Sequence, residues 1–478
     1  MRGLSCLLWP WVALGGLGGC AQLAGIDKTN GDERQVTLTY DRLSIGAKVA
    51  TAPLALDGLT ATYLVPDDTN ASVLVPEPAE AVTSGEWAAK IKTGTPPVLF
   101  TLPDGATYLW ALPSRTMHGA FAALEHPGVI APPPGASVTV NAVLDAPVAA
   151  GDSFEFLEVG TWVRAALTMP ALAETALAQS FPYLSTAAMT SDDVVLVSRY
   201  SGGALAAVGE IVPAGPQAVA TTIAATLAPV AHDQMIAMPL DAAGIAARLT
   251  GEKPAETTAA GLSWSITAAP AFAQGVTVGP LLASGAVAPT ATTLGATFGN
   301  PFAATHMWSS LLAFSAARSR TYAPAGAMGP SIGLVTALGE VTVPDATTPI
   351  AAAVALPLVI TVGITPLVAD GTSVLIDATK PVPVSFTTDG MPASLFEMEL
   401  VELVPNGATF TQKRLLVLAS DTPSWQIPAS FLAPAHRYFF RAITISGGYG
   451  DVATGDLSTV TTPYAMGSHD GGVFTVTL

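Results

Sequence analysis

Charged residues are scarce in this chain of 478 residues, because Asp, Glu, Lys and Arg together make up 12% of it, about half of the usual share. Basic residues are the scarcer kind: 19 Lys and Arg stand against 36 Asp and Glu, a formal net charge of −17. A surface this acidic repels phosphate groups, and no basic stripe with interleaved aromatic residues counters it, so we expect no nucleic-acid partner. The hydrophobic share of 50% excludes a disordered chain.

Cysteine is almost absent, since Cys6 and Cys20 are the only two and both lie near the N-terminus. The histidines form no H-E-x-x-H motif or other ligand pair; they are His118, His126, His232, His306, His436 and His469. The common zinc sites need such pairs or several cysteines. We therefore expect no metal and no cofactor.

The first twenty residues have the form of an export signal. Arg2 is their single charge, an apolar stretch follows, and the run Leu17-Gly18-Gly19-Cys20 closes it. This run resembles a bacterial lipobox. The resemblance implies that residues 1–19 are a signal peptide and that Cys20 is the site of lipid attachment. The alternative is an ordinary signal peptide that carries a cysteine near its end.

Lipid attachment at Cys20 would leave no disulfide in the mature chain, because cleavage also removes Cys6. Three acyl chains would hold the protein on a membrane, its first expected partner. Residues 20–35 then form the acylated cysteine and a polar, flexible tether. In the lipoproteins that this anchor resembles, an acidic residue after the cysteine favours the inner membrane; Ala21 stands here, so we expect the outer membrane or the cell surface.

Short alternating runs bounded by Gly, Pro, Asn or Asp recur along the chain, and the 39 prolines and 44 glycines disfavour long helices. The pattern predicts an all-β protein of several consecutive antiparallel β-sandwich domains of the immunoglobulin-like type. Two alanine-rich segments, 163–179 and 217–227, are candidates for one or two short helices that cap a sandwich. The uncharged run 350–369 is long enough to span a membrane, but Pro357, Gly363 and Pro366 favour a pair of core strands.

Composition breaks divide the expected sandwiches. A proline-rich stretch at 131–135 and a break at 251–261 suggest boundaries. The predicted segments are 36–145, 146–258 with a possible helix, 259–376, and 377–478.

The last segment carries the clearest pattern. Phe386 ends a predicted strand, the alternating set Phe396, Met398 and Leu400 follows, and Leu432, Pro434 and Tyr438 have the spacing of a turn before a later strand. This succession resembles a fibronectin type III domain, with Phe386 where that family usually has tryptophan. The resemblance implies that Tyr438 forms a tyrosine corner and that Phe440 and Ala442 point inward. It implies no catalytic residue.

One formal catalytic motif occurs, Gly329-Pro330-Ser331-Ile332-Gly333, which fits the G-x-S-x-G elbow of serine hydrolases. The elbow needs a strand before the serine and a helix after it, whereas the flanking residues favour a loop and then a strand, so we interpret the motif as a Gly/Pro turn. The pairs Glu155 with Glu158 and Glu397 with Glu399 could serve as glycosidase carboxylates, but the outer face of a sandwich explains them more simply. We therefore expect no catalytic residue.

Acidic loops and tryptophans are the remaining candidates. Calcium could bind near Asp67-Asp68-Thr69-Asn70, Asp192-Asp193 or Asp470-Gly471, although turns of the Asx type are the simpler interpretation. Exposed tryptophans could stack on sugar rings, and Trp87 and Trp308 are the two that we expect to be exposed. The other tryptophans of the mature chain are Trp110, Trp162, Trp264 and Trp425.

These observations favour a lipid-anchored, non-enzymatic protein of the cell envelope with an adhesion, scaffold or assembly role and a protein or glycan partner. The alternative is a glycan-binding module or a polysaccharide-acting enzyme at the envelope. A concave face with exposed tryptophans and paired carboxylates would favour the alternative.

Overall fold

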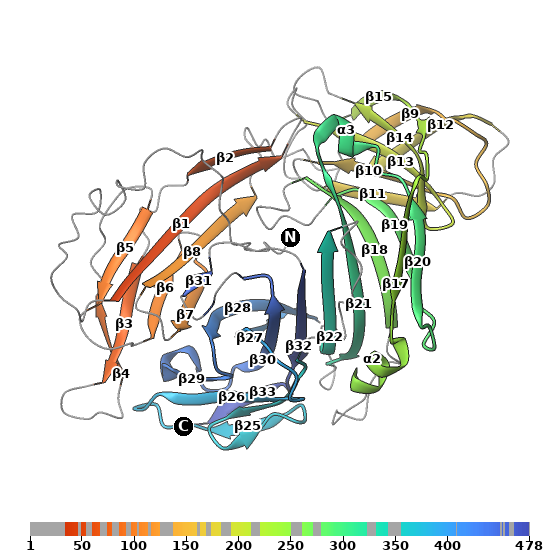
Figure 1. Cartoon of the computed structure of the whole chain (residues 1–478). Coiled ribbons are helices and arrows are strands. Elements are labelled where there is room, and N and C mark those ends of the chain that lie inside the picture. The colour runs from red at the N-terminus through yellow and green to blue at the C-terminus, as the bar shows by residue number, and fades with distance from the viewer. Residues whose placement is uncertain are drawn as a thin grey trace.

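A computed structural model of the chain gives its fold (Figure 1). It describes residues 34–45, 49–53, 60–66, 74–78, 86–91, 97–102, 105–112, 116–124, 137–159, 163–168, 174–182, 193–211, 220–249, 261–270, 279–322, 331–342, 355–407, 409–449, 452, 455–457 and 463–477. Strands dominate these residues, with two short α-helices, so the all-β prediction is confirmed. Within the same residues, no helix has the length and apolar character needed to cross a membrane.

The N-terminal sandwich consists of two sheets. Its strands are β1 (Arg34–Ile45), β2 (Val49–Pro53), β3 (Thr60–Pro66), β4 (Leu74–Pro78), β5 (Glu86–Ile91), β6 (Val98–Thr101), β7 (Thr107–Ala111) and β8 (Thr116–Leu124). Strand β1 pairs with β2, β5 and β8, while β3, β4, β6 and β7 form the second sheet. The ring of Trp110 on β7 reaches Gly119 on β8, where a Cβ atom would lie 2.1 Å from it. A side chain at position 119 would therefore push the two sheets apart.

A second sandwich follows. Strands β9 (Ser137–Val143), β12 (Ala176–Pro182) and β15 (Ala220–Thr226) form one sheet, and β10 (Ser153–Glu158), β11 (Val163–Thr168), β13 (Val195–Ser201) and β14 (Ala204–Ile211) form the other. Phe154 and Phe156 pack between these sheets. Gly202 and Gly203 connect β13 and β14 with φ of 59° and 85°, as a type I′ hairpin turn requires.

The expected helices in 163–179 and 217–227 are a wrong prediction, because β11, β12 and β15 occupy these segments. Alanine favours helices in isolation, but here Ala165, Leu177, Ile223 and Ala225 supply a buried sandwich face, and tertiary pairing outweighs local propensity. The two short helices occur elsewhere, at α2 (Ala242–Leu249) and α3 (Phe302–His306).

The third group of strands packs against the free face of β10, β13 and β14. It comprises β16 (Ala228–Pro229), β17 (Gln234–Pro239), β18 (Gly261–Ala269), β19 (Leu281–Ala286), β20 (Thr293–Phe298), β21 (Ser309–Thr321) and β22 (Ser331–Thr342). Leu157, Leu196 and Tyr200 belong to the same buried cluster as Phe298 and Phe314. The second sandwich and this third group of strands therefore share a core.

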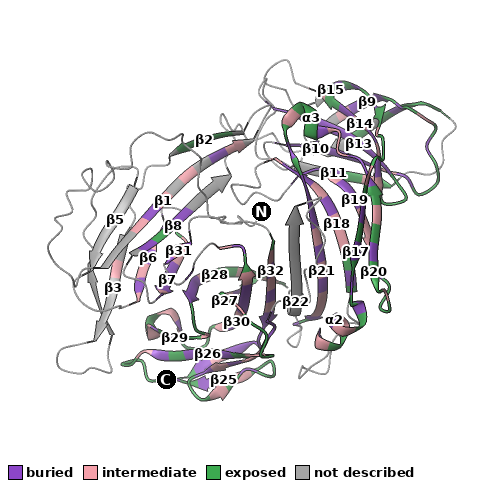
Figure 2. Ribbon diagram, viewed as in Figure 1, coloured by how far each residue is buried: buried purple, intermediate pink, exposed green. Residues whose placement is uncertain are grey.

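The C-terminal sandwich comprises β23 (Pro357–Val362), β24 (Thr365–Pro366), β25 (Thr372–Leu375), β26 (Val382–Thr388), β27 (Leu395–Asn406), β28 (Thr409–Ser420), β29 (Ser424–Ile427), β30 (Arg437–Gly447), β32 (Tyr464–Asp470) and β33 (Phe474–Thr477). The sheet β24-β23-β26-β29 faces the sheet that contains β28, β27, β30 and β32. Along β26, buried residues alternate with exposed ones (Figure 2).

The expected inward residues of this sandwich are confirmed. Phe386, Met398 and Phe440 lie in its core, and Phe396 packs against Phe386 with the ring centroids 5.9 Å apart. The Tyr438 hydroxyl accepts a hydrogen bond of 2.9 Å from the Ala433 backbone N–H. Tyr438 thus forms the expected corner.

The uncharged run 350–369 contains a strand pair, as expected. Strands β23 and β24 form a hairpin, and Ile360 and Val362 are fully buried. Gly363 has a φ of 61° at the turn, where a residue with a Cβ atom would be strained.

Two of the predicted domain boundaries, at 258 and 376, lie between strands that pair with each other. Strand β17 pairs with β20 across the boundary at 258, and β23 and β25 pair with β26 and β33 across the boundary at 376. Composition breaks did not reveal these pairings, because they join strands that are distant in sequence. The strands on either side of each boundary are therefore hydrogen-bonded to each other.

Strand pairing also joins the sandwiches to one another. Strand β28 pairs in parallel with β7 of the N-terminal sandwich, and β32 pairs with β22. The strand β31 (Asp456–Leu457) pairs with β8. Figure 1 shows the C-terminal strands, in blue, between the red and orange N-terminal strands and the green ones. Most pairs are antiparallel as predicted, but β1–β8, β9–β15, β25–β33, β7–β28 and β8–β31 are parallel.

The corner at Tyr438 is testable by Tyr438→Phe, which removes the acceptor of the Ala433 N–H. We expect the free energy of unfolding to fall by about 1–2 kcal/mol, because a partly buried N–H loses its partner. Urea denaturation measures this change. Tyr322→Phe is the matched control, since Tyr322 is also buried but its side chain forms no hydrogen bond among the described residues; an equal loss in both variants would contradict the prediction.

Candidate functional site

A dense group of charges among the described residues lies on the outer face of the β28-β27-β30-β32 sheet. Glu399 on β27, Arg414 on β28, Arg441 on β30 and Asp470 on β32 form it, and we call these four residues the Arg441 cluster. The register places Glu399 opposite Arg441 and Arg441 opposite Asp470. Alternation along neighbouring strands therefore brings these side chains to one face.

Arg441 is the centre of the cluster. Its Nε and Nη2 donate to the two oxygens of Asp470 at 2.7 and 3.1 Å, and its Nη1 donates to Glu399 at 3.2 Å. Arg414 donates to the other oxygen of Glu399 at 3.2 Å. Burial opposes the charge of Arg441, but hydrogen bonds and ion pairs with Asp470 and Glu399 outweigh it and raise the pKa of the guanidinium group.

Glu397 lies beside this cluster on the same face of β27. Burial, together with the charge of Glu399, raises the pKa of Glu397 to about 7, although Arg414 acts in the opposite direction. The pair Glu397 and Glu399 thus shares a face as predicted, with one carboxyl group biased toward protonation. Both oxygens of Glu399 accept hydrogen bonds from arginines, which tie this carboxylate to β28 and β30.

The pair Glu155 and Glu158 is not brought together. The two residues are three positions apart on β10, so their side chains point to opposite faces of the sheet. Both are buried, and Glu155 accepts a hydrogen bond of 2.8 Å from the Tyr200 hydroxyl. They cannot act on one sugar ring.

Ser331 is the first residue of β22, opposite Thr321 on β21. A strand rather than a helix follows it, so the serine-hydrolase elbow is not formed. The strand agrees with the sequence-based interpretation, whereas Gly329 and Pro330 of the expected turn lie outside the described residues.

The histidines do not converge. His306 contacts Glu210 at 2.8 Å, His232 contacts the Leu205 carbonyl at 2.9 Å, and His436 contacts Glu402. His118 is exposed and His469 is buried, while His126 lies outside the described residues. Among the residues that are described, no three His, Cys, Asp or Glu side chains are placed to hold a metal ion.

Trp308 is buried, with an exposed fraction of 3%, so the suspicion that it forms a stacking platform is wrong. It packs between His306 and Phe302, with ring centroids 4.8 and 5.3 Å away. Trp110 and Trp425 are also buried, and Trp264 is half-buried. The side chain of Trp87 and all of Trp162 lie outside the described residues.

The acidic loops are described only in part. Asp67, Asp68, Asn70 and Asp192 lie outside the described residues, as does the lipid-attachment candidate Cys20. Asp193 is buried, and Asp470 is bound by Arg441. At Asp470 an ion pair therefore takes the place that a calcium ion would need.

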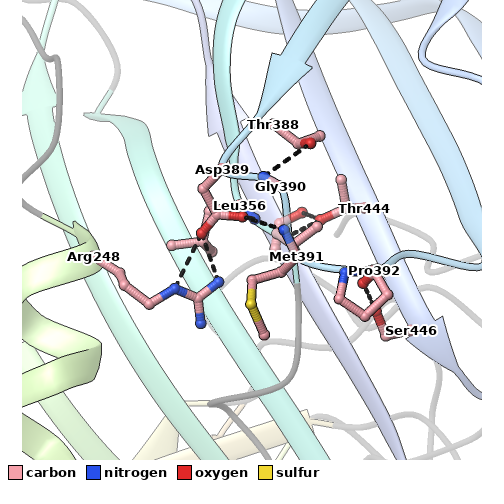
Figure 3. Close-up of polar contacts among 11 residues, drawn as sticks. Arg248, Leu356, Thr388, Asp389, Gly390, Met391, Pro392, Thr444 and Ser446 are labelled. Atoms are coloured by element: carbon pink, nitrogen blue, oxygen red, sulfur yellow. Dashed lines mark hydrogen bonds and ion pairs between the residues drawn. The ribbon is translucent and has the colours of Figure 1, made fainter.

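A second polar site joins α2 to the C-terminal sandwich (Figure 3). The Arg248 Nε and Nη2 donate to Asp389 Oδ2 at 3.0 and 2.7 Å, and Asp389 Oδ1 accepts from the backbone N–H groups of Leu356 and Met391 at 3.0 and 3.4 Å. Burial acts to raise the pKa of Asp389, but these hydrogen bonds and the charge of Arg248 outweigh it and lower the pKa. Sequence reasoning missed this contact because the partners are 141 positions apart.

The two sites do similar work. Each fixes one structural element on another, and neither leaves a nucleophile beside a base. Glu399, Arg441, Asp470, Arg248 and Asp389 are engaged in these contacts.

Replacement of Arg441 tests whether the cluster is structural. Arg441→Met removes the two-pronged partner of the buried Asp470, so we expect the free energy of unfolding to fall by about 3 kcal/mol. Arg414→Met is the control, expected to cost less than about 1 kcal/mol because Glu399 keeps Arg441. Equal losses in urea titrations would show that Arg441 has no central role.

A double-mutant cycle tests the contact of α2. Arg248→Met and Asp389→Asn remove the charges. The side-chain amide introduced by the second substitution keeps an acceptor for the Leu356 N–H. We expect a coupling free energy of about 1 kcal/mol between the two substitutions. The exposed pair Asp377 and Lys380, 2.9 Å apart, is the control and should couple by less than about 0.5 kcal/mol. Additive effects of the first pair would refute the contribution of this contact.

No protein-family model matches the chain, and no curated protein sequence matches it. Among solved structures, the chain aligns with one described as a tetra-tandem repeat in the extending region of a large adhesion protein. The identity is 11%, the alignment covers 85% of this chain and 95% of that one, and the TM-score is 0.11. That score does not establish a shared arrangement of strands, so the all-β assignment depends on the strands of this chain.

Proposed function

We propose that this protein is a lipid-anchored, non-enzymatic component of the cell envelope that acts as a scaffold or in adhesion. The observation that carries the proposal is the pairing of strands between sandwiches, at β7–β28 and β22–β32. Such pairing makes one continuous body from parts that could otherwise move as separate domains. A continuous body suits a protein that presents surfaces at a fixed distance from a membrane.

The candidate catalytic and sugar-binding residues support the same proposal, because each of them has a structural role. Glu399 is held by two arginines, Ser331 begins a strand, and Trp308 is buried. An envelope enzyme that acts on polysaccharides would need a free carboxylate pair and an exposed aromatic platform. Within the described part of the chain, these residues do not supply that combination.

The anchor is proposed from the sequence run that ends at Cys20. Acylation there would fix the protein to a membrane, and Ala21 favours the outer membrane or the cell surface. A protein or glycan partner would meet the sandwiches on the aqueous side.

The anchor is tested in full-length chain expressed in a Gram-negative bacterium. Cys20→Ser should abolish incorporation of labelled palmitate and move the protein from the membrane fraction to the soluble fraction, because the thiol that would carry the lipid is gone. Cys6→Ser is the matched control and should keep both properties. Palmitate incorporation that survives Cys20→Ser would refute the anchor.

A further inference from the structure

The C-terminal sheet is covered on both faces. Its inner face packs on the β24-β23-β26-β29 sheet, and part of its outer face belongs to a buried cluster shared with the N-terminal sandwich. That shared cluster contains Leu395, Val417, Ala419, Ile443 and Ile445 from the C-terminal sheet, with Val452 and Leu457 from the segment that follows β30. It contains Leu38, Val98, Phe100, Leu102, Tyr108, Trp110, Leu112 and Met117 from the N-terminal sandwich. We call it the docking cluster.

Glu397 lies at the margin of the docking cluster. The register places it opposite Ala419 on β28 and opposite Ile443 on β30, and Leu395 precedes it on the same face of β27. Three of its neighbours on this face are therefore apolar members of the docking cluster, and the fourth is Glu399. A carboxylate is poorly solvated in such surroundings.

The nearby cations compensate the charge of Glu397 only in part. Arg414 and Arg441 both bind Glu399, and Arg441 also binds Asp470. Glu397 itself forms no hydrogen bond or ion pair in the part of the chain that the structure describes. Among the described residues, the titratable or charged groups around it are Glu399 on its own strand, Arg414, Arg441 and Asp470 on the neighbouring strands, and Tyr108 and Tyr449 at the docking cluster.

We propose that Glu397 makes the attachment of the N-terminal sandwich to the C-terminal sandwich depend on pH, with a firmer attachment when its carboxyl group carries a proton. The neutral carboxyl group fits beside Ala419 and Ile443. The ionised group draws water toward the margin of the docking cluster and repels Glu399. The attachment then loosens without loss of either sandwich.

The direction follows from the difference in proton binding between the two states. Burial raises the pKa of Glu397 to about 7, against 4.5 for a solvated glutamate, so a state in which separation of the sandwiches exposes this carboxyl group to water would hold the proton less tightly. The stability that this proton adds to the attached state is fully present below about pH 4.5 and is lost as the pH rises toward 7. One such group changes the opening equilibrium by at most about tenfold per pH unit.

Hydrogen exchange of the whole protein at pH 5.5 and pH 8, corrected for intrinsic exchange rates, tests the proposal. We expect peptides that cover β6 and β7 to lose protection at pH 8 by between about threefold and thirtyfold, because these strands open when the attachment loosens. Peptides that cover β13 and β14, within another sandwich, should keep their protection. Unchanged protection of β7 in the wild type would overturn the proposal.

Glu397→Gln assigns the effect to this residue. The amide is neutral at both pH values, so β6 and β7 should show the same protection at pH 5.5 and pH 8. Glu174→Gln, an exposed glutamate before β12, is the matched control and should keep the pH dependence of the wild type. A pH dependence that persists in Glu397→Gln would transfer the effect to another group and overturn the assignment.

Discussion

A sheet edge exposes a row of backbone donors and acceptors, and in this protein the larger sheet of the C-terminal sandwich pairs both of its edges with other parts of the chain. Strand β28 pairs with β7, and β32 pairs with β22. An open edge can pair with a strand of another molecule. Pairing within the chain therefore gives the backbone N–H and C=O groups of the edge their hydrogen bonds and also limits aggregation. The positions of the N-terminal sandwich and of the β21–β22 hairpin both depend on this constraint.

Side-chain contacts complete what backbone pairing begins. The docking cluster covers part of the outer sheet face, the Arg441 cluster lies next to it, and Arg248 ties α2 to the loop that contains Asp389. Buried charges such as Asp470 are expensive to desolvate and are kept here with a two-pronged arginine partner. Charged residues are rare in the sequence, and several of them serve these internal junctions.

The junctions differ in their response to conditions. Hydrogen bonds and the charge of Arg248 lower the pKa of Asp389, so this carboxylate stays charged at neutral pH, whereas Glu397 is biased toward protonation by its apolar neighbours. At the cell envelope, where we propose that the protein acts, the pH would vary. A body whose parts are joined by such different contacts can remain folded while one junction adjusts.

The sequence by itself determined the all-β class, the inward alternation at Met398 and Leu400, and the corner at Tyr438, because these features depend on local spacing and on one short turn. It also placed Glu397 and Glu399 on one face. Tertiary structure alone decided that alanine-rich segments become strands and that Trp308 is buried. It also decided that Glu399 binds Arg441 rather than a ligand. The reason is physical: edge pairing and desolvation depend on residues from distant parts of the chain, which no local pattern specifies.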